Sequence, residues 1–176
     1  MNNRHSIRLK AMSEEHLGLV LSWRNHKEVR KYMYTQREIL SHEHALWFEM
    51  ASKDPLRNLL IFEIENTPLG FVSFTQKECR TIADWGFYLA PDVPKGTGSE
   101  LGIAALNFSF HELGLHKLCG QVLGYNNRSI RFHLKLGFIK EGVLRQQHYD
   151  NLNYHDIHCF GILDSEWKSG ENKNVR

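Results

Sequence analysis

Cysteine is scarce in this chain of 176 residues, and long apolar runs are missing. Cys79, Cys119 and Cys159 are odd in number, far apart and without a CxxC pair, which fits reduced thiols better than a disulfide framework. No window approaches the ~18 apolar residues of a membrane span. The N-terminus carries early charges but no apolar stretch of the kind a secretory signal needs. We therefore expect a cytoplasmic protein with no membrane partner.

An excess of charge of one sign is missing as well. Lys and Arg number 22 and Asp and Glu 20, a formal net charge of +2. Nucleic-acid-binding proteins usually show a clustered basic excess, so no nucleic-acid partner is expected. The hydrophobic share of 41% and charged share of 24% are ordinary for one globular domain. Because apolar content falls away only at the end, we predict one domain over 1–164 and a loose polar tail over 165–176.

The spacing of the apolar residues changes along the chain between the periods of strands and of helices, and so predicts that strands and helices are interspersed. A helix over 97–113 is apolar nearly all round, which is typical of a helix buried against a sheet. The order predicts an α/β (α+β) fold with helices on both faces of a mixed sheet. The expected strands are 6–11, 58–65, 69–74, 82–89, 115–123, 138–143 and 154–163. Four other helices are expected: one that begins at Ser13, a short one that ends near Tyr34, one that begins at Ser41 and one over 126–135.

The segment before the apolar helix is the most informative local feature. Glycines there let the backbone approach a ligand closely, and the free N–H groups of a helix N-terminus suit a pyrophosphate. The spacing matches neither a Walker A loop nor a dinucleotide fingerprint. A plain glycine turn capping a helix is the alternative. The residues concerned are Lys95, Gly96, Thr97, Gly98 and Ser99, with hydroxyl donors at 97 and 99 and a cation at 95.

A second motif follows some 30 residues later, from Asn126 through Ser129 and His133 to Gly137 and Phe138. Together with the glycine loop, it resembles the signature of the GNAT superfamily of acetyl-CoA-dependent N-acetyltransferases. The resemblance covers almost the whole chain. It implies a single-domain GNAT fold, with a twisted, mostly antiparallel mixed sheet of about seven strands. It also implies acetyl-CoA as co-substrate.

The resemblance also implies how acetyl-CoA is held. Two neighbouring strands splay apart in this superfamily, and backbone N–H groups near Phe87 to Leu89 would bind the acyl-pantetheine arm and polarise the thioester. Asn126 matches the position that binds the pantetheine end, although Asn127 is adjacent. His133 replaces the family's usual Tyr, the proposed proton donor to the thiolate. An imidazolium can also supply a proton, so His133 is a candidate acid and cofactor contact.

A general base is harder to assign. Enzymes of this kind often use a Glu on a central strand. The corresponding strand here carries Gln121, which cannot accept a proton. Ser73, Tyr88 and a water chain are the remaining candidates, with Asp84 a weaker one. The amine could also arrive already neutral.

The N-terminal segment, with Trp23-Arg24-Asn25 and a helix containing His44, resembles a subgroup of sugar-nucleotide N-acetyltransferases from pseudaminic acid biosynthesis, the route to a sugar on bacterial flagellins. That implies transfer to the 4-amino group of UDP-4-amino-4,6-dideoxy-N-acetyl-β-L-altrosamine. Arginine offers a bidentate fork for phosphates, and an aromatic surface at Tyr34, His44 or Trp47 suits uracil. Matching positions make Arg24, Asn25, His44, Thr75, Gln76 and Tyr88 the expected nucleotide-sugar contacts, and a homodimer stays open.

Ordinary structural roles compete with each of these assignments. Trp23 and Trp47 could be core residues, Arg24 could pair with Glu28 at (i, i+4), and Asn25 could cap a helix. An N-terminal protein acetyltransferase of the ribosomal-protein type is the rival enzyme, although residues 22–50 show no acidic cluster. A non-catalytic acyl-CoA-binding module is the alternative outside enzymes. The His42-x-His44 and His155-x-x-His158 pairs do not place two ligands on one face, so no metal site is predicted.

Overall fold

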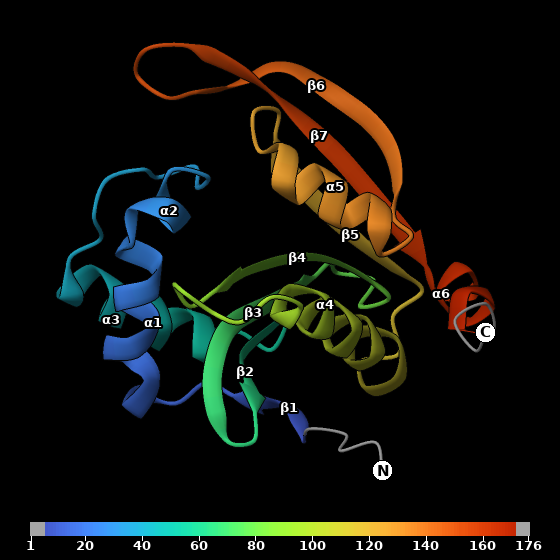
Figure 1. Cartoon of the computed structure of the whole chain (residues 1–176), viewed down its shortest axis with the longest axis horizontal. Helices are drawn as coiled ribbons and strands as arrows, with labels where there is room; N and C mark the ends of the chain where they lie inside the picture. Colours follow the sequence, from blue (N-terminus) through green and yellow to red (C-terminus); the bar gives the residue numbers. More distant parts are fainter. Residues whose placement is uncertain (1–5, 172–176) are drawn as a thin grey trace.

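A computed structural model describes the backbone of residues 6–171 and the side chains through Trp167. Its centre is one seven-stranded sheet in the order β1-β2-β3-β4-β5-β7-β6 (Figure 1). All neighbours are antiparallel except β4 and β5, which run parallel. This confirms the predicted mixed, mostly antiparallel sheet. The strands are β1 (Ile7–Ala11), β2 (Arg57–Ile64), β3 (Thr67–Gln76), β4 (Ile82–Leu89), β5 (Lys117–Leu123), β6 (Ile139–Tyr149) and β7 (Tyr154–Leu163).

Helices cover both faces of the sheet. One face carries α1 (Leu17–Asn25) and α3 (Ser41–Ser52), with the one-turn α2 (Lys27–Arg30) between them. The other face carries α4 (Thr97–Asn107) and α5 (Asn127–Lys135) (Figure 1). A 3₁₀ turn at Glu14–His16 precedes α1, and a π-helical turn at Phe108–Glu112 extends α4. None of the described helices is both long and apolar enough to cross a membrane.

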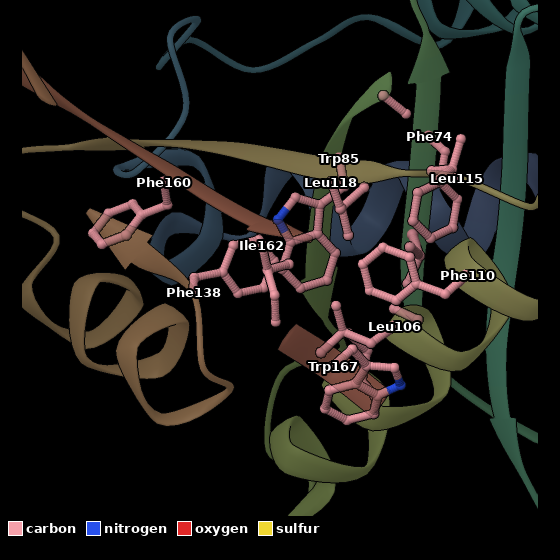
Figure 2. Close-up of a cluster of buried hydrophobic side chains, with 14 of the residues drawn as sticks. Phe74, Trp85, Leu106, Phe110, Leu115, Leu118, Phe138, Phe160, Ile162 and Trp167 are labelled. Carbon is pink, nitrogen blue, oxygen red and sulfur yellow. The ribbon is translucent and has the colours of Figure 1, made fainter. Parts of the chain in front are cut away.

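Two apolar clusters hold these layers together. The smaller cluster joins Val20 and Trp23 of α1 and Phe48 of α3 to Ile61 and Phe71 of the sheet. The larger cluster lies under α4 and α5 (Figure 2), and it includes aromatic residues of β3, β4 and β7 as well as aromatic residues of helices. Trp23 is thus a core residue, which was its alternative reading. The labelled members of the larger cluster are Phe74, Trp85, Leu106, Phe110, Leu115, Leu118, Phe138, Phe160, Ile162 and Trp167.

The C-terminal segment differs from the predicted polar tail. Residues Asp164–Glu171 form a helix, α6. Trp167 is 9% exposed in the larger cluster (Figure 2), and its indole nitrogen donates to Oδ1 of Asn107 across 3.0 Å. One aromatic residue among polar ones is therefore enough to hold the start of this segment against α4.

The β6–β7 hairpin is longer than the sequence indicates. The predicted strand 138–143 extends to Tyr149, and the hairpin projects beyond the rest of the sheet (Figure 1). Most of β6 is exposed on both faces, so its polar end has no alternation from which a strand could be predicted. The third helix begins at Ser41, and Glu43 accepts the backbone N–H of Leu40 just ahead of it.

Candidate active site

A fork in the sheet is the centre of the candidate site. The parallel pairing of β4 with β5 covers only Ile82–Asp84 against Lys117–Cys119. Beyond those residues the two strands diverge, as Figure 1 shows. The backbone groups on the inner edges of the fork consequently have no strand partner. Diverging central strands are what the family resemblance implies.

The inner edge of β4 presents bare amides to the fork. Ala90 N–H donates to Leu69 O, and Lys77 N–H to Ile82 O. With the observed register, these bonds direct the even-numbered residues of β4 toward β3, because residues alternate in an antiparallel ladder. The N–H and C=O groups of Phe87 and Leu89 therefore point into the fork. These are the two residues expected to hold the acyl-pantetheine arm.

The glycine loop lies at the start of α4, as predicted. Gly96 has φ = +100° and precedes the first residue of the helix, a conformation that favours glycine. Ser99 N–H and Glu100 N–H both donate to Gly96 O. Within residues 6–171, no backbone oxygen accepts from the amide of Gly98. The loop thus offers an unpaired amide at the positive end of an 11-residue helix.

The side chains of the loop divide into exposed and buried ones. Lys95 is exposed, and Ser99 is half-buried, with Nζ of Lys135 at 3.4 Å from its Oγ. Thr97 is only 2% exposed, so its hydroxyl is not presented to solvent as the sequence suggested. Lys135 places a cation against the loop at Ser99, and Lys95 is a second cation in the loop itself, a combination that suits a diphosphate.

The α5 helix closes the other side of the fork. Asn126 Oδ1 accepts from Ser129 N–H and caps the helix. His133 is 2% exposed. Its Nε2 accepts from the indole N–H of Trp85, and its Nδ1 lies 2.8 Å from Ser129 O. Since the indole can only donate and the carbonyl can only accept, the imidazole carries its proton on Nδ1.

These contacts change the interpretation of His133. Both ring nitrogens are engaged inside the protein, and burial lowers the pKa of the imidazole despite the hydrogen bond to Ser129. A neutral ring with no free N–H is poorly suited to donate a proton to a thiolate. The geometry therefore disfavours the acid role that the sequence suggested for His133 and favours a structural one.

The sheet face opposite α5 is left open beside the fork. We call it the open face and define it by the side chains of Ser73, Asp84, Tyr88, Cys119 and Gln121, which the strand registers place on one side. Asp84 forms an ion pair with Lys77. Ser73 Oγ reaches only Gly86 O, across 3.4 Å, so no basic side chain activates it. Gln121 is exposed.

Tyr88 and Arg24 lie together at the far end of the open face. Burial raises the pKa of the Tyr88 phenol, while the charge of Arg24 lowers it. A phenol with a raised pKa remains protonated and is a donor rather than a base. Burial also lowers the pKa of His44, and the charge of Arg24 lowers it further. His44 is 6% exposed and stacks on Trp47 at 5.1 Å between ring centroids.

Arg24 itself is incompletely paired. Its Nη2 donates to Thr35 O across 2.8 Å, but its Nη1 is buried without a hydrogen-bond partner in the described structure. Glu28, the alternative partner at (i, i+4), pairs with Lys31 instead. A buried guanidinium nitrogen without a partner costs free energy. A hydrogen-bond acceptor placed against Nη1 would remove that cost.

The other expected sugar contacts are dispersed. Asn25 exchanges two hydrogen bonds with the backbone of Ile39 and so holds the chain before α3. Thr75 lies on the open face opposite Asp84. Gln76, the next residue, points to the other face and donates to Arg80 O. Side chains of Thr75 and Gln76 therefore do not share one face.

Sequence reasoning missed Trp85 and Tyr125, and it did not predict the contact between Tyr34 and Gln121. Trp85 is the partner of His133. Tyr34 Oη donates to Gln121 Oε1 across 3.0 Å, and Tyr125 Oη donates to Lys31 O. These contacts join positions 48 to 94 residues apart, and no local pattern signals them. Within the described residues, no group of three or more His, Cys, Asp or Glu side chains could hold a metal ion.

Comparisons with known proteins agree with this geometry. The model of the acetyltransferase (GNAT) domain family matches residues 6–139. The SPbeta prophage-derived N-acetyltransferase YokL of Bacillus subtilis is 36% identical over 123 residues, 68% of either chain. The spermidine N(1)-acetyltransferase of Vibrio cholerae is 23% identical over 164 residues, 92% of this chain and 95% of the relative.

Solved structures show the same fold. A crystal structure of the Vibrio cholerae spermidine N-acetyltransferase in complex with CoA and spermine has a TM-score of 0.85 at 22% identity, covering 92% of this chain and 98% of that one. A dodecameric structure of the same enzyme has a TM-score of 0.76 at 21% identity, covering 92% and 95%.

The forked sheet, the glycine loop before α4 and the family match over residues 6–139 lead to one conclusion. This chain belongs to the GNAT acetyltransferase family and is an acetyl-CoA-dependent N-acetyltransferase.

Proposed function

We propose that this N-acetyltransferase acts on a small-molecule amine that also carries an anionic group. The specific candidate is the 4-amino group of the UDP-linked 4-amino-4,6-dideoxy sugar of pseudaminic acid biosynthesis. The observation that carries the proposal is the buried, unpartnered Nη1 of Arg24. A phosphate or carboxylate of the acceptor would satisfy this nitrogen. Tyr88 and His44, which are close to Arg24, would form the neutral surroundings of that anion.

Ion pairs of several described carboxylates support an anionic acceptor over a polyamine. A polycation is bound by carboxylates that lack a cation partner, and several carboxylates of residues 28–43 and of the sheet already have one. Glu28 pairs with Lys31, and Asp84 with Lys77. The further pairs are Glu38 with Arg30, Glu43 with Arg37 and Glu141 with Lys117. Spermidine is still the second candidate, because the Vibrio cholerae acetyltransferase described above acts on it by name.

Acetyl-CoA is the acetyl donor in this proposal. The diphosphate would bind the amides and cations around Gly96 to Ser99, and the acyl-pantetheine arm would enter the fork. There the amides of Phe87 and Leu89 would polarise the thioester carbonyl. The acceptor amine would attack from the open face. The phenol of Tyr88, which remains protonated, would donate a hydrogen bond to the leaving thiolate, and the proton that the amine loses on acylation would pass to that thiolate.

A matched panel of amines tests the acceptor. CoA release is measured with the UDP-linked 4-amino sugar, the same amino sugar without UDP, spermidine and a peptide with a free N-terminus. We expect the highest kcat/KM with the UDP-linked sugar. Equal kcat/KM for the two sugars would show that the anion is not recognised. A higher kcat/KM with spermidine or the peptide would establish the polyamine or protein acceptor instead.

A further inference from the structure

The chain between α2 and α3 crosses over to the distant half of the sheet. We call residues 31–36 the strap. Tyr125, just after β5, donates to Lys31 O across 3.0 Å and accepts from Gln36 Nε2 across 2.9 Å. The ring of Tyr125 also stacks on Tyr32, with centroids 6.1 Å apart. The strap is therefore attached to the far side of the fork by contacts on both of its ends.

Tyr34 is in the middle of the strap and contacts the fork itself. Its hydroxyl donates to Gln121 Oε1 across 3.0 Å, and the ring meets His148 edge-on, with centroids 5.3 Å apart. Gln121 follows Gly120, the first residue of β5 after the parallel pairing ends at Cys119. The phenol of Tyr34 thus lies over the open face at the point where the strands diverge. The phenol is partly buried there, but Tyr34 as a residue is 52% exposed, so a ligand can reach it.

The hydrogen bond to Gln121 determines what the phenol can do. Because the hydroxyl proton is donated to Gln121, the lone pairs of the phenolic oxygen face away from Gln121 and can accept. Burial of the Tyr34 phenol, together with Cys159 and Asp84, raises its pKa, so it remains neutral. An attacking amine has N–H groups that need acceptors while its lone pair points at the thioester. Gln121 cannot itself take a proton, but it can hold the phenol in this orientation.

We propose that Tyr34 binds the acceptor amine, its phenolic oxygen accepting an N–H, and that Gln121 is the positioning residue that orients this phenol. The inference rests on acetyl transfer to an amine entering from the open face, as in the proposed function. It does not depend on the anionic group of the acceptor.

Substitutions at both positions test this inference. Tyr34→Phe removes the acceptor, and Gln121→Leu removes its orientation, whereas Gln121→Glu keeps an oxygen that accepts the phenol proton. Tyr149→Phe is the matched control, since Tyr149 is 51% exposed on the hairpin. KM and kcat are measured with whichever amine of the panel gives the highest kcat/KM. Losing one hydrogen bond should raise KM for that amine roughly five- to tenfold and leave KM for acetyl-CoA unchanged.

The combination of variants separates binding from folding. We expect the double variant Tyr34→Phe/Gln121→Leu to be no worse than either single variant, because both remove one interaction. Gln121→Glu should stay close to wild type. Additive losses, or a Tyr34→Phe variant that matches Tyr149→Phe, would overturn the inference. A preference for spermidine in the panel would contradict the proposed function alone, because the Tyr34 test would then use spermidine.

Discussion

The indole nitrogen of Trp85 donates to Nε2 of His133 across 3.2 Å and joins β4 to α5 at the base of the fork. The rings of Phe138 and Phe160 enclose the imidazole, with centroids 5.0 Å away in each case. A Cβ on Gly120 would lie 2.6 Å from the same nitrogen. There is therefore no room for a side chain at position 120, and the hydrogen bond stabilises the point where the strands part.

The first prediction separates folding from catalysis at this position. His133→Phe leaves the indole N–H of Trp85 buried without an acceptor, so we expect the free energy of unfolding to fall by about 1–3 kcal/mol. Turnover of the folded protein should change only a fewfold. Urea denaturation and steady-state CoA release measure the two effects. A hundredfold loss of kcat with unchanged stability would restore His133 as the acid.

The second prediction concerns pH. Burial lowers the pKa of His133, and also of His44 and His158, below the ordinary 6.5. On acidification the three imidazoles therefore take up protons at a higher pH in the unfolded chain than in the folded chain. Their contribution to stability is fully present above about pH 6.5 and is lost as pH falls toward the folded pKa values. The acidic side chain of Glu43, with its pKa lowered to about 2, loses its contribution only below about pH 4.5.

Urea denaturation between pH 7.5 and 5.5 isolates the histidines from the carboxylates. We expect the wild-type free energy of unfolding to decrease over this range, and the decrease to be smaller in His133→Gln. The exposed His42→Gln is the control and should keep the wild-type slope. An identical slope in wild type and His133→Gln would show that His133 does not contribute.

Local patterns predicted the order of the elements and the two motifs, because burial on one face imposes a period on the sequence. The glycine loop could be located because Gly96 needs a positive φ. The end of β6 from Arg145 to Tyr149 could not be located, because it is exposed on both faces and burial therefore imposes no period on its residues. The partners of His133 and Gln121 could not be predicted either, since contacts between distant positions depend on how the layers pack. Arg24 was identified from sequence, but its unpaired nitrogen only from structure.

The third prediction tests the glycine loop. A Cβ on Gly96 would meet nothing within 4 Å, so space is not the constraint there. The constraint is the φ of +100° at Gly96, because an L-residue at that angle strains the backbone by about 1–2 kcal/mol. Gly96→Ala should therefore turn the loop amides and weaken acetyl-CoA binding roughly tenfold by calorimetry. Gly142→Ala, also with open space but on β6, should bind as wild type. Unchanged affinity in Gly96→Ala would exclude this loop as the diphosphate site.

The fourth prediction concerns the unpaired guanidinium. Arg24→Met keeps much of the apolar stem and removes the buried donor, so the cost of leaving Nη1 unpaired disappears along with the bond to Thr35 O. We expect thermal unfolding to change little, whereas KM for the UDP-linked sugar should rise roughly ten- to a hundredfold, as for a lost charged hydrogen bond. KM for acetyl-CoA and for the sugar without UDP should not change. Arg24→Lys should be intermediate, because it keeps the charge and loses the fork. A parallel rise in KM for all three compounds would mean that Arg24 supports the fold of the site rather than binding the acceptor's anion.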